Sequence, residues 1–286
     1  MTETHGGYYV PHGSHWPMVG SVGLTTMLVG FAMHLNGSGI GLETMAIGAA
    51  IVIFMMFGWF GTVIRESEAH MYNDQVDRSF RWGMSWFIFS EVMFFAAFFG
   101  ALFYARMFSV PWLGGEDPST HQLLYPDYQA AWPTNGPAEM GGAFETIPAW
   151  GIPALNTLIL LTSGVTVTLA HWALKKNNRG ALVGWLLATV ALGFTFLGFQ
   201  IHEYGEAYRH LNLTLESGIY GSTFFMLTGF HGAHVTIGAI MLTVIMFRAI
   251  KGHFTPDRHF AFEAVAWYWH FVDVVWLGLF IFVYWL

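Results

Sequence analysis

The chain has 286 residues, of which 55% are hydrophobic and only 10% are charged, whereas soluble domains carry about a quarter charged residues. This composition and the long apolar runs place the chain among membrane proteins. Its formal net charge of −7 comes without a basic patch that could neutralise phosphates, so nucleic-acid binding is excluded, and the absence of Cys excludes disulfides and thiolate metal sites.

Seven apolar runs are long enough to cross the hydrocarbon core of a bilayer, which takes about 20 helical residues. They do not alternate polar and apolar residues as barrel strands do. The sequence therefore predicts an all-α, polytopic membrane protein that forms a single membrane domain over residues 1–286. In chain order the predicted spans cover residues 17–35, 44–64, 80–108, 153–174, 180–199, 218–247 and 260–285.

The basic residues predict the orientation of these spans. Nine of the eleven Lys and Arg residues lie in the connections that follow the second, fourth and sixth spans, and the other two are Arg106 and Arg209. Cytoplasmic loops carry the excess of basic residues. We therefore expect a cytoplasmic N-terminus and a C-terminus on the opposite, periplasmic side.

One predicted connection, residues 109–152, is much longer than the others. It contains six prolines and five acidic residues but no Lys or Arg, and it falls on the outer side. Loops of this length are either functional or partly disordered. We interpret it as an ordered cap over the helix bundle, and the sequence assigns it no further role.

Glu91 is the most informative ionisable residue, because it falls near the middle of the third span, where a charge is costly. A helical projection places Phe94, Phe95 and Phe98 on its side and the small residues, such as Gly83 and Gly100, on the other. Small residues mark close helix packing, so we expect this helix to pack through its glycine and alanine side. Glu91 then faces aromatic surroundings, which favour its protonated form unless a cationic partner is near. Two interpretations stay open: a reactive or proton-exchanging carboxyl, and a neutral acid that donates one hydrogen bond.

Two pairs of polar residues fall in the last two spans. His231 and His234 share a face of the sixth span, and His270 and Asp273 share a face of the seventh. The two spans are antiparallel, so the pairs are expected at one level. Haem or metal ligation is one interpretation. We favour a hydrogen-bonded polar seam between the helices, with no metal and no cofactor in this chain.

At the predicted cytoplasmic rim, Arg65, Glu66, Arg248 and His253 fall at the depth of lipid head groups. Basic residues at this depth attract anionic lipid. These four are candidate contacts for phospholipid, although ordinary topology-setting charge gives the same pattern.

Several strings in the second half of the chain resemble subunit III of the haem–copper cytochrome c oxidases. The final span carries the most specific one, because it is long and rich in aromatic residues. The strings are YGSTFF (Tyr220–Phe225), TGFHGAHV (Thr228–Val235), HFT (His253–Thr255), FEA (Phe262–Ala264) and WYWHFVDVVWL (Trp267–Leu277).

This resemblance implies a seven-helix subunit in two groups, the first two helices and the last five, without haem or copper of its own. It implies direct binding to subunit I, which with subunit II holds the haem and copper that pass electrons from cytochrome c to oxygen in the respiratory chain. It further implies that the subunit binds phospholipid, stabilises subunit I and supports its proton uptake. Glu91 matches the family's carbodiimide-reactive carboxyl, and Arg65, Glu66, Arg248 and His253 match residues near bound lipid.

Two features bear on the branch of the family. The long connection at 109–152 favours a bacterial protein of the inner membrane, and the two N-terminal spans favour cytochrome c over quinol as electron donor. The alternatives are subunit III of a quinol oxidase and, from another class, an independent proton channel or transporter built around Glu91. No internal repeat or broken span supports the transporter.

Overall fold

The computed structural model describes residues 13–286, and within them every regular element is a helix. Seven helical segments there are long and apolar enough to cross a membrane, which confirms the predicted number. The chain divides into two compact units, Met1–Phe80 and Arg81–Leu286, which are described separately. The predicted single membrane domain stays a prediction.

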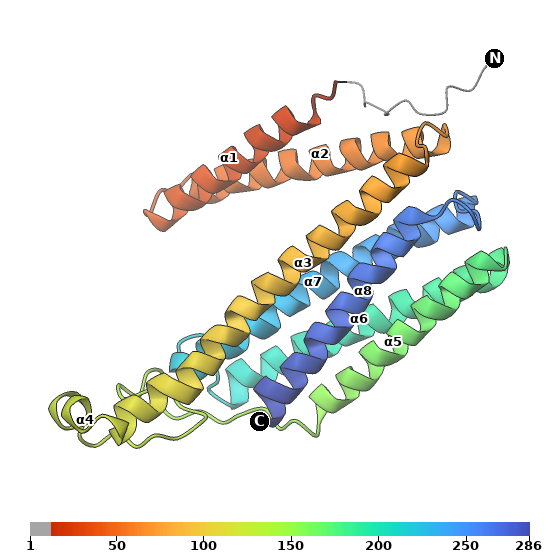
Figure 1. The fold of residues 1–286 in the computed structure, drawn as a ribbon. Coiled ribbons are helices and arrows are strands. Elements are labelled where there is room, and N and C mark those ends of the chain that lie inside the picture. Colours follow the sequence, from red (N-terminus) through yellow and green to blue (C-terminus); the bar gives the residue numbers. More distant parts are fainter. Residues whose placement is uncertain (1–12) are drawn as a thin grey trace, which may run out of the picture. The chain divides into compact units, whose positions relative to one another are not determined.

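Unit 1 is built around a pair of antiparallel helices, α1 (Trp16–Leu35) and α2 (Gly41–Glu68) (Figure 1). Glycine brings their backbones together. A Cβ at Gly30 or at Gly48 would lie 2.2 Å from a backbone nitrogen of the facing helix, closer than any side chain allows. The abundant glycine therefore acts in this unit as small residues do in membrane helices, by permitting close backbone packing.

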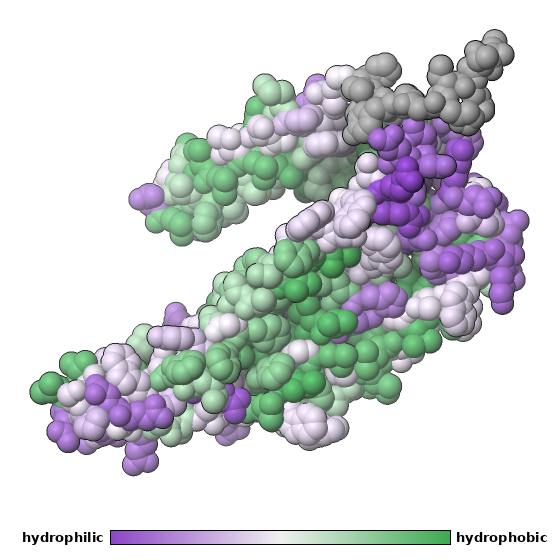
Figure 2. Space-filling model, in the orientation of Figure 1, coloured by the Kyte–Doolittle hydropathy of each residue, from purple (hydrophilic) through white to green (hydrophobic). Residues whose placement is uncertain are grey.

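Unit 2 contains the other five spans, which run alongside one another (Figure 1). Hydrophobic side chains cover the middle of these helices and hydrophilic ones gather toward their ends, as a bilayer requires (Figure 2). The last span is the most buried of the seven, because 61% of its apolar 18-residue stretch is buried. The helices are α3 (Asp74–Tyr104, whose first residues belong to unit 1), α5 (Ile152–Lys175), α6 (Arg179–His210), α7 (Gly218–Lys251) and α8 (Phe260–Leu279), which continues into the π-helical η3 (Phe280–Trp285).

Trp269 fixes α8 against three neighbours at one level. Its side chain is fully buried, and its indole nitrogen donates a hydrogen bond of 2.9 Å to the Ser163 hydroxyl of α5. The ring lies against Gly193 of α6 and Gly238 of α7, where an added Cβ would approach it to 2.8 Å. The aromatic string of the last span therefore provides the centre of the helix bundle of unit 2.

The long connection begins later than predicted. The third span continues beyond residue 108 through two π-helical turns, η1 (Ala105–Ser109) and η2 (Trp112–Glu116), and the short α4 (Pro118–Leu124) follows. Asp117 caps α4: hydrogen bonds from the Thr120 hydroxyl and backbone N–H hold the pKa of its carboxyl below the usual value.

The later part of the connection packs on the N-terminal end of α7. Phe144 stacks on Tyr220 at 5.5 Å between ring centroids, and Trp132 meets the same ring edge-on at 5.7 Å. The Tyr220 backbone N–H donates to the Thr134 carbonyl at 3.2 Å. These contacts agree with an ordered cap on this end of unit 2.

The fifth span is also longer than predicted, since α6 runs to His210 instead of ending near residue 199. Glu203 lies beyond the predicted end of this span and is almost fully buried, because its face of α6 continues the buried stripe of Phe196 and Gln200.

Candidate functional site

Glu91 of α3 meets His234 of α7 inside unit 2. The Glu91 Oε2 lies 2.9 Å from His234 Nε2. The other ring nitrogen, Nδ1, donates to the Phe230 carbonyl at 2.6 Å, because a carbonyl oxygen can only accept. In the neutral ring Nε2 is then an acceptor. The pair therefore shares one proton, carried either by a neutral carboxyl or by an imidazolium beside a carboxylate, and is neutral overall in both arrangements.

Aromatic rings surround this pair. Phe95 lies 5.0 Å from the His234 ring, and Phe94 meets Phe230 at 5.0 Å, both measured between centroids. The side chains of His234 and Glu91 are 12% and 23% exposed, so both are partly buried. The aromatic surroundings of Glu91 agree with the helical projection. The sequence analysis also allowed for a cationic partner near Glu91, and His234 occupies that position.

The predicted packing side of α3 is wrong. A Cβ added at Gly83 or at Gly100 would meet nothing within 4 Å. The helix packs instead through the aromatic side that carries Glu91. Burial of large rings together with the satisfied carboxyl outweighs the closer approach that small residues would allow.

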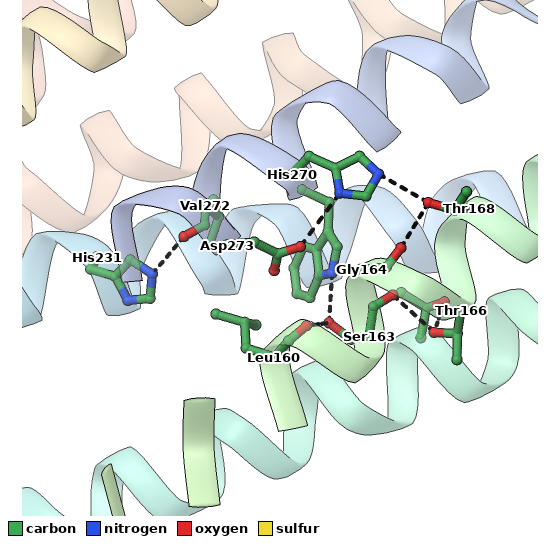
Figure 3. Close-up of polar contacts among 11 residues, drawn as sticks. Leu160, Ser163, Gly164, Thr166, Thr168, His231, His270, Val272 and Asp273 are labelled. Atoms are coloured by element: carbon green, nitrogen blue, oxygen red, sulfur yellow. Dashed lines mark hydrogen bonds and ion pairs between the residues drawn. The ribbon is translucent and has the colours of Figure 1, made fainter. Parts of the chain in front are cut away.

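The structure does not bring the four residues of the predicted seam together. His231, which is fully buried, donates from Nε2 to the Val272 carbonyl at 3.2 Å, and so links α7 to α8. His270 lies on the other side of α8, with Nδ1 at 3.5 Å from Asp273 Oδ2 and Nε2 at 3.3 Å from the Thr168 hydroxyl of α5 (Figure 3). With His234 turned to α3, these residues link α7 to α8 and to α3, and α8 to α5.

Gly164 makes room for the Asp273 carboxylate. A Cβ at this position of α5 would lie 2.4 Å from Asp273 Oδ2. Gly164 thus belongs to the contact between α5 and α8, next to Ser163, whose hydroxyl accepts from Trp269.

The candidate lipid residues lie in both units. In unit 1, Arg65 donates to the Thr62 hydroxyl at 3.0 Å and Glu66 accepts from the Tyr72 hydroxyl at 2.7 Å. In unit 2, the Arg248 guanidinium lies 4.7 Å from the centroid of Phe254. The His253 backbone N–H donates to the Arg248 carbonyl at 3.1 Å, at the end of α7. Lipid binding at these residues stays a prediction.

Two clusters escape the sequence analysis. The buried Glu203 accepts a hydrogen bond of 2.5 Å from the Tyr284 hydroxyl of η3. Its burial could have been inferred from the periodic spacing of the buried residues on α6. The second cluster joins His171, His259 and Glu263, whose ligand atoms all lie within 4.8 Å of one another. Among residues 13–286 this is the one group of three that could share a metal ion. His259 and Glu263 are four residues apart, whereas His171 lies 88 residues before His259, so the sequence does not show that the three meet.

The fold and these contacts define a polytopic α-helical membrane protein whose ionisable side chains pair with one another between helices. The family model described as cytochrome c oxidase subunit III matches residues 6–286. Cytochrome c oxidase subunit 3 of Marchantia polymorpha is 43% identical over 274 residues, which are 95% of this chain and 93% of that protein. The proteins of the same name from Arabidopsis thaliana (41%, covering 97% and 96%) and Neotragus moschatus (40%, covering 100% and 99%) are similar over their whole length.

The chain therefore belongs to the cytochrome c oxidase subunit III family. It is part of a haem–copper oxidase, an oxidoreductase complex of the respiratory chain, and assembles with other subunits of that complex. Subunit III carries no redox cofactor itself. The resemblance found in the sequence strings is thereby confirmed, and the independent transporter is not supported.

Proposed function

We propose that this chain is the non-catalytic subunit III of a proton-pumping cytochrome c oxidase, bound directly to subunit I in a complex that also contains subunit II. The haem and copper belong to those partners, and cytochrome c is the electron donor. The observation that carries this proposal is the similarity to proteins of this name over nearly the entire length of both chains.

The proposed contribution of the chain is support of subunit I: stabilisation, phospholipid binding and help with proton uptake. Glu91 and His234 support the last part, because a proton shared by two partly buried side chains among aromatic rings is one that can be exchanged. We place the chain in a bacterial inner membrane with a cytoplasmic N-terminus and a periplasmic C-terminus. The distribution of Lys and Arg supports this orientation.

The decisive experiment is gentle purification through a tag on this chain, with visible spectra and mass spectrometry of everything that accompanies it. We expect a haem protein of many spans and a second subunit with a copper-binding domain, in amounts equal to this chain. The untagged strain is the control. A colourless chain without partners would contradict the proposal, and a subunit II without copper ligands would assign the complex to the quinol oxidases.

Lipid binding has its own test. The double variant Arg248→Ala/His253→Ala is expected to purify with less phosphatidylglycerol or cardiolipin, because the cationic contact at the end of α7 is lost. The matched control is Lys175→Ala/Lys176→Ala, at exposed positions at the end of α5. Equal anionic lipid in both variants, measured by mass spectrometry, would remove these residues from the lipid site.

A further inference from the structure

Three segments of unit 2 bring potential metal ligands together. His171 comes from the last turns of α5, His259 immediately precedes α8, and Glu263 lies in the first turn of α8. His259 Nε2 lies 3.2 Å from His171 Nε2 and 3.2 Å from Glu263 Oε1, and the distance from His171 Nε2 to the same oxygen is 3.6 Å. Three ligand atoms thus form a nearly equilateral triangle.

The neighbours of the cluster fix which atoms face its centre. His259 Nδ1 donates to the Thr255 carbonyl at 3.0 Å, so Nδ1 carries the hydrogen and the Nε2 lone pair points inward in the neutral ring. Arg81 pairs with Oε2 of Glu263, which leaves Oε1 to the two histidines. In protein metal sites, the ligating histidine commonly donates its other N–H to a carbonyl, and the ligating carboxylate accepts a hydrogen bond from a neighbour. These contacts orient the ligands.

Two facing lone pairs at these distances need a hydrogen or a cation between them. A single proton can bridge one edge of the triangle, whereas a metal ion satisfies all three. In a tetrahedral zinc site, bonds of about 2.0–2.2 Å place neighbouring ligand atoms roughly 3.3–3.5 Å apart. The separations in the cluster match this value without movement of the backbone.

We propose that His171, His259 and Glu263 bind a divalent transition-metal ion of the zinc class. Two imidazoles and one carboxylate are a ligand set that zinc prefers, whereas calcium and magnesium require more oxygen ligands. The positive charge of Arg81 offsets part of the negative charge of Glu263. This also disfavours calcium and magnesium, because these ions depend on carboxylate charge. A fourth position is left for water or another ligand.

The site would tie together two helix ends and the segment between α7 and α8. The α5 and α8 helices pack on each other, and these ends of the two helices lie side by side (Figure 1). The side chains are 23%, 8% and 12% exposed for His171, His259 and Glu263, so an ion can reach them from the surface. An ion bound here would stabilise the start of the most buried span.

The test uses the full chain purified together with its accompanying subunits, washed with chelator and equilibrated with buffered free Zn²⁺. We expect the wild type to bind one more zinc than His171→Ala or His259→Ala at micromolar free zinc, measured by elemental mass spectrometry. Glu263→Gln keeps the shape of the side chain and is expected to weaken this site by at least the roughly 10–100-fold that outer-shell changes cost. His202→Ala, at an exposed histidine elsewhere on the chain, is the control and is expected to bind as the wild type does.

A second measurement does not depend on the folding of the variants. Zn²⁺ should slow deuterium exchange in residues 253–263 and 168–176 of the wild type. Equal zinc content in the wild type and all three site variants would overturn the proposal, as would unchanged exchange in both segments. Because the ligands all belong to this chain, either result stands apart from whether oxidase subunits accompany it.

Discussion

At the scale of single residues, unit 2 pairs its ionisable groups across helices instead of leaving them to lipid. Glu91 and His234 are the clearest case, with 2.9 Å between oxygen and nitrogen and aromatic rings around them. A buried polar atom that loses its partner costs about 1–3 kcal/mol, whereas removal of both partners can be nearly neutral. The pair is therefore expected to behave as one energetic unit.

Glu91→Leu and His234→Leu should each destabilise the protein by about 1–3 kcal/mol, because each strands the other polar group. The double variant should lose clearly less than the sum of the two, which is the signature of direct coupling. Glu91→Gln is the control, since its amide can donate to the Nε2 lone pair. Thermal unfolding of the purified complex measures all four, and strict additivity would mean that the two side chains do not interact.

At the scale of helices, α8 is held by close packing around one large ring. Trp269 is fully buried between Gly193 and Gly238, and its indole N–H donates to the Ser163 hydroxyl of α5. A ring enclosed on several sides cannot move away from an added methyl group. The two glycines are therefore required for space, not for backbone conformation.

Gly193→Ala and Gly238→Ala should each lower stability by about 1–3 kcal/mol, the usual cost of overpacking. Gly198→Ala is the matched control on α6, since a Cβ there meets nothing within 4 Å. That change should be neutral or slightly stabilising, because alanine favours helix more than glycine does. Melting temperatures of the complex decide the matter, and equal effects at positions 193 and 198 would show that Trp269 tolerates the methyl group.

At the scale of the whole molecule, the basic residues lie almost entirely in the connections that follow the even-numbered spans. Residues 13–286 contain the seven spans on which the predicted orientation depends, and one span more or fewer would place these charges on both sides. The orientation itself is a prediction that can be tested directly, since the chain contains no cysteine to interfere with labelling.

Lys176→Cys, after the fourth span, should react with a membrane-impermeant maleimide only when the cytoplasmic face is accessible, as in inverted vesicles. Glu139→Cys, in the long connection, should react from the opposite face, in intact spheroplasts. Both positions are exposed. Labelling of both from one face would contradict the orientation, and reaction after solubilisation in detergent controls for buried thiols.

The sequence alone determined the helical class, the seven spans, the family and the identity of Glu91 as a residue in aromatic surroundings. These features follow from local composition, from the length needed to cross a bilayer, and from strings within single helices. The tertiary structure decided which side chains meet: His234 with Glu91, His270 with Thr168, and His171 with His259 and Glu263. Such partners come from different helices, so their contacts depend on how each helix is rotated and packed. That rotation reversed the expected packing side of α3, because burial of its large aromatic rings outweighed the close approach of small residues, a balance that no single helix reveals.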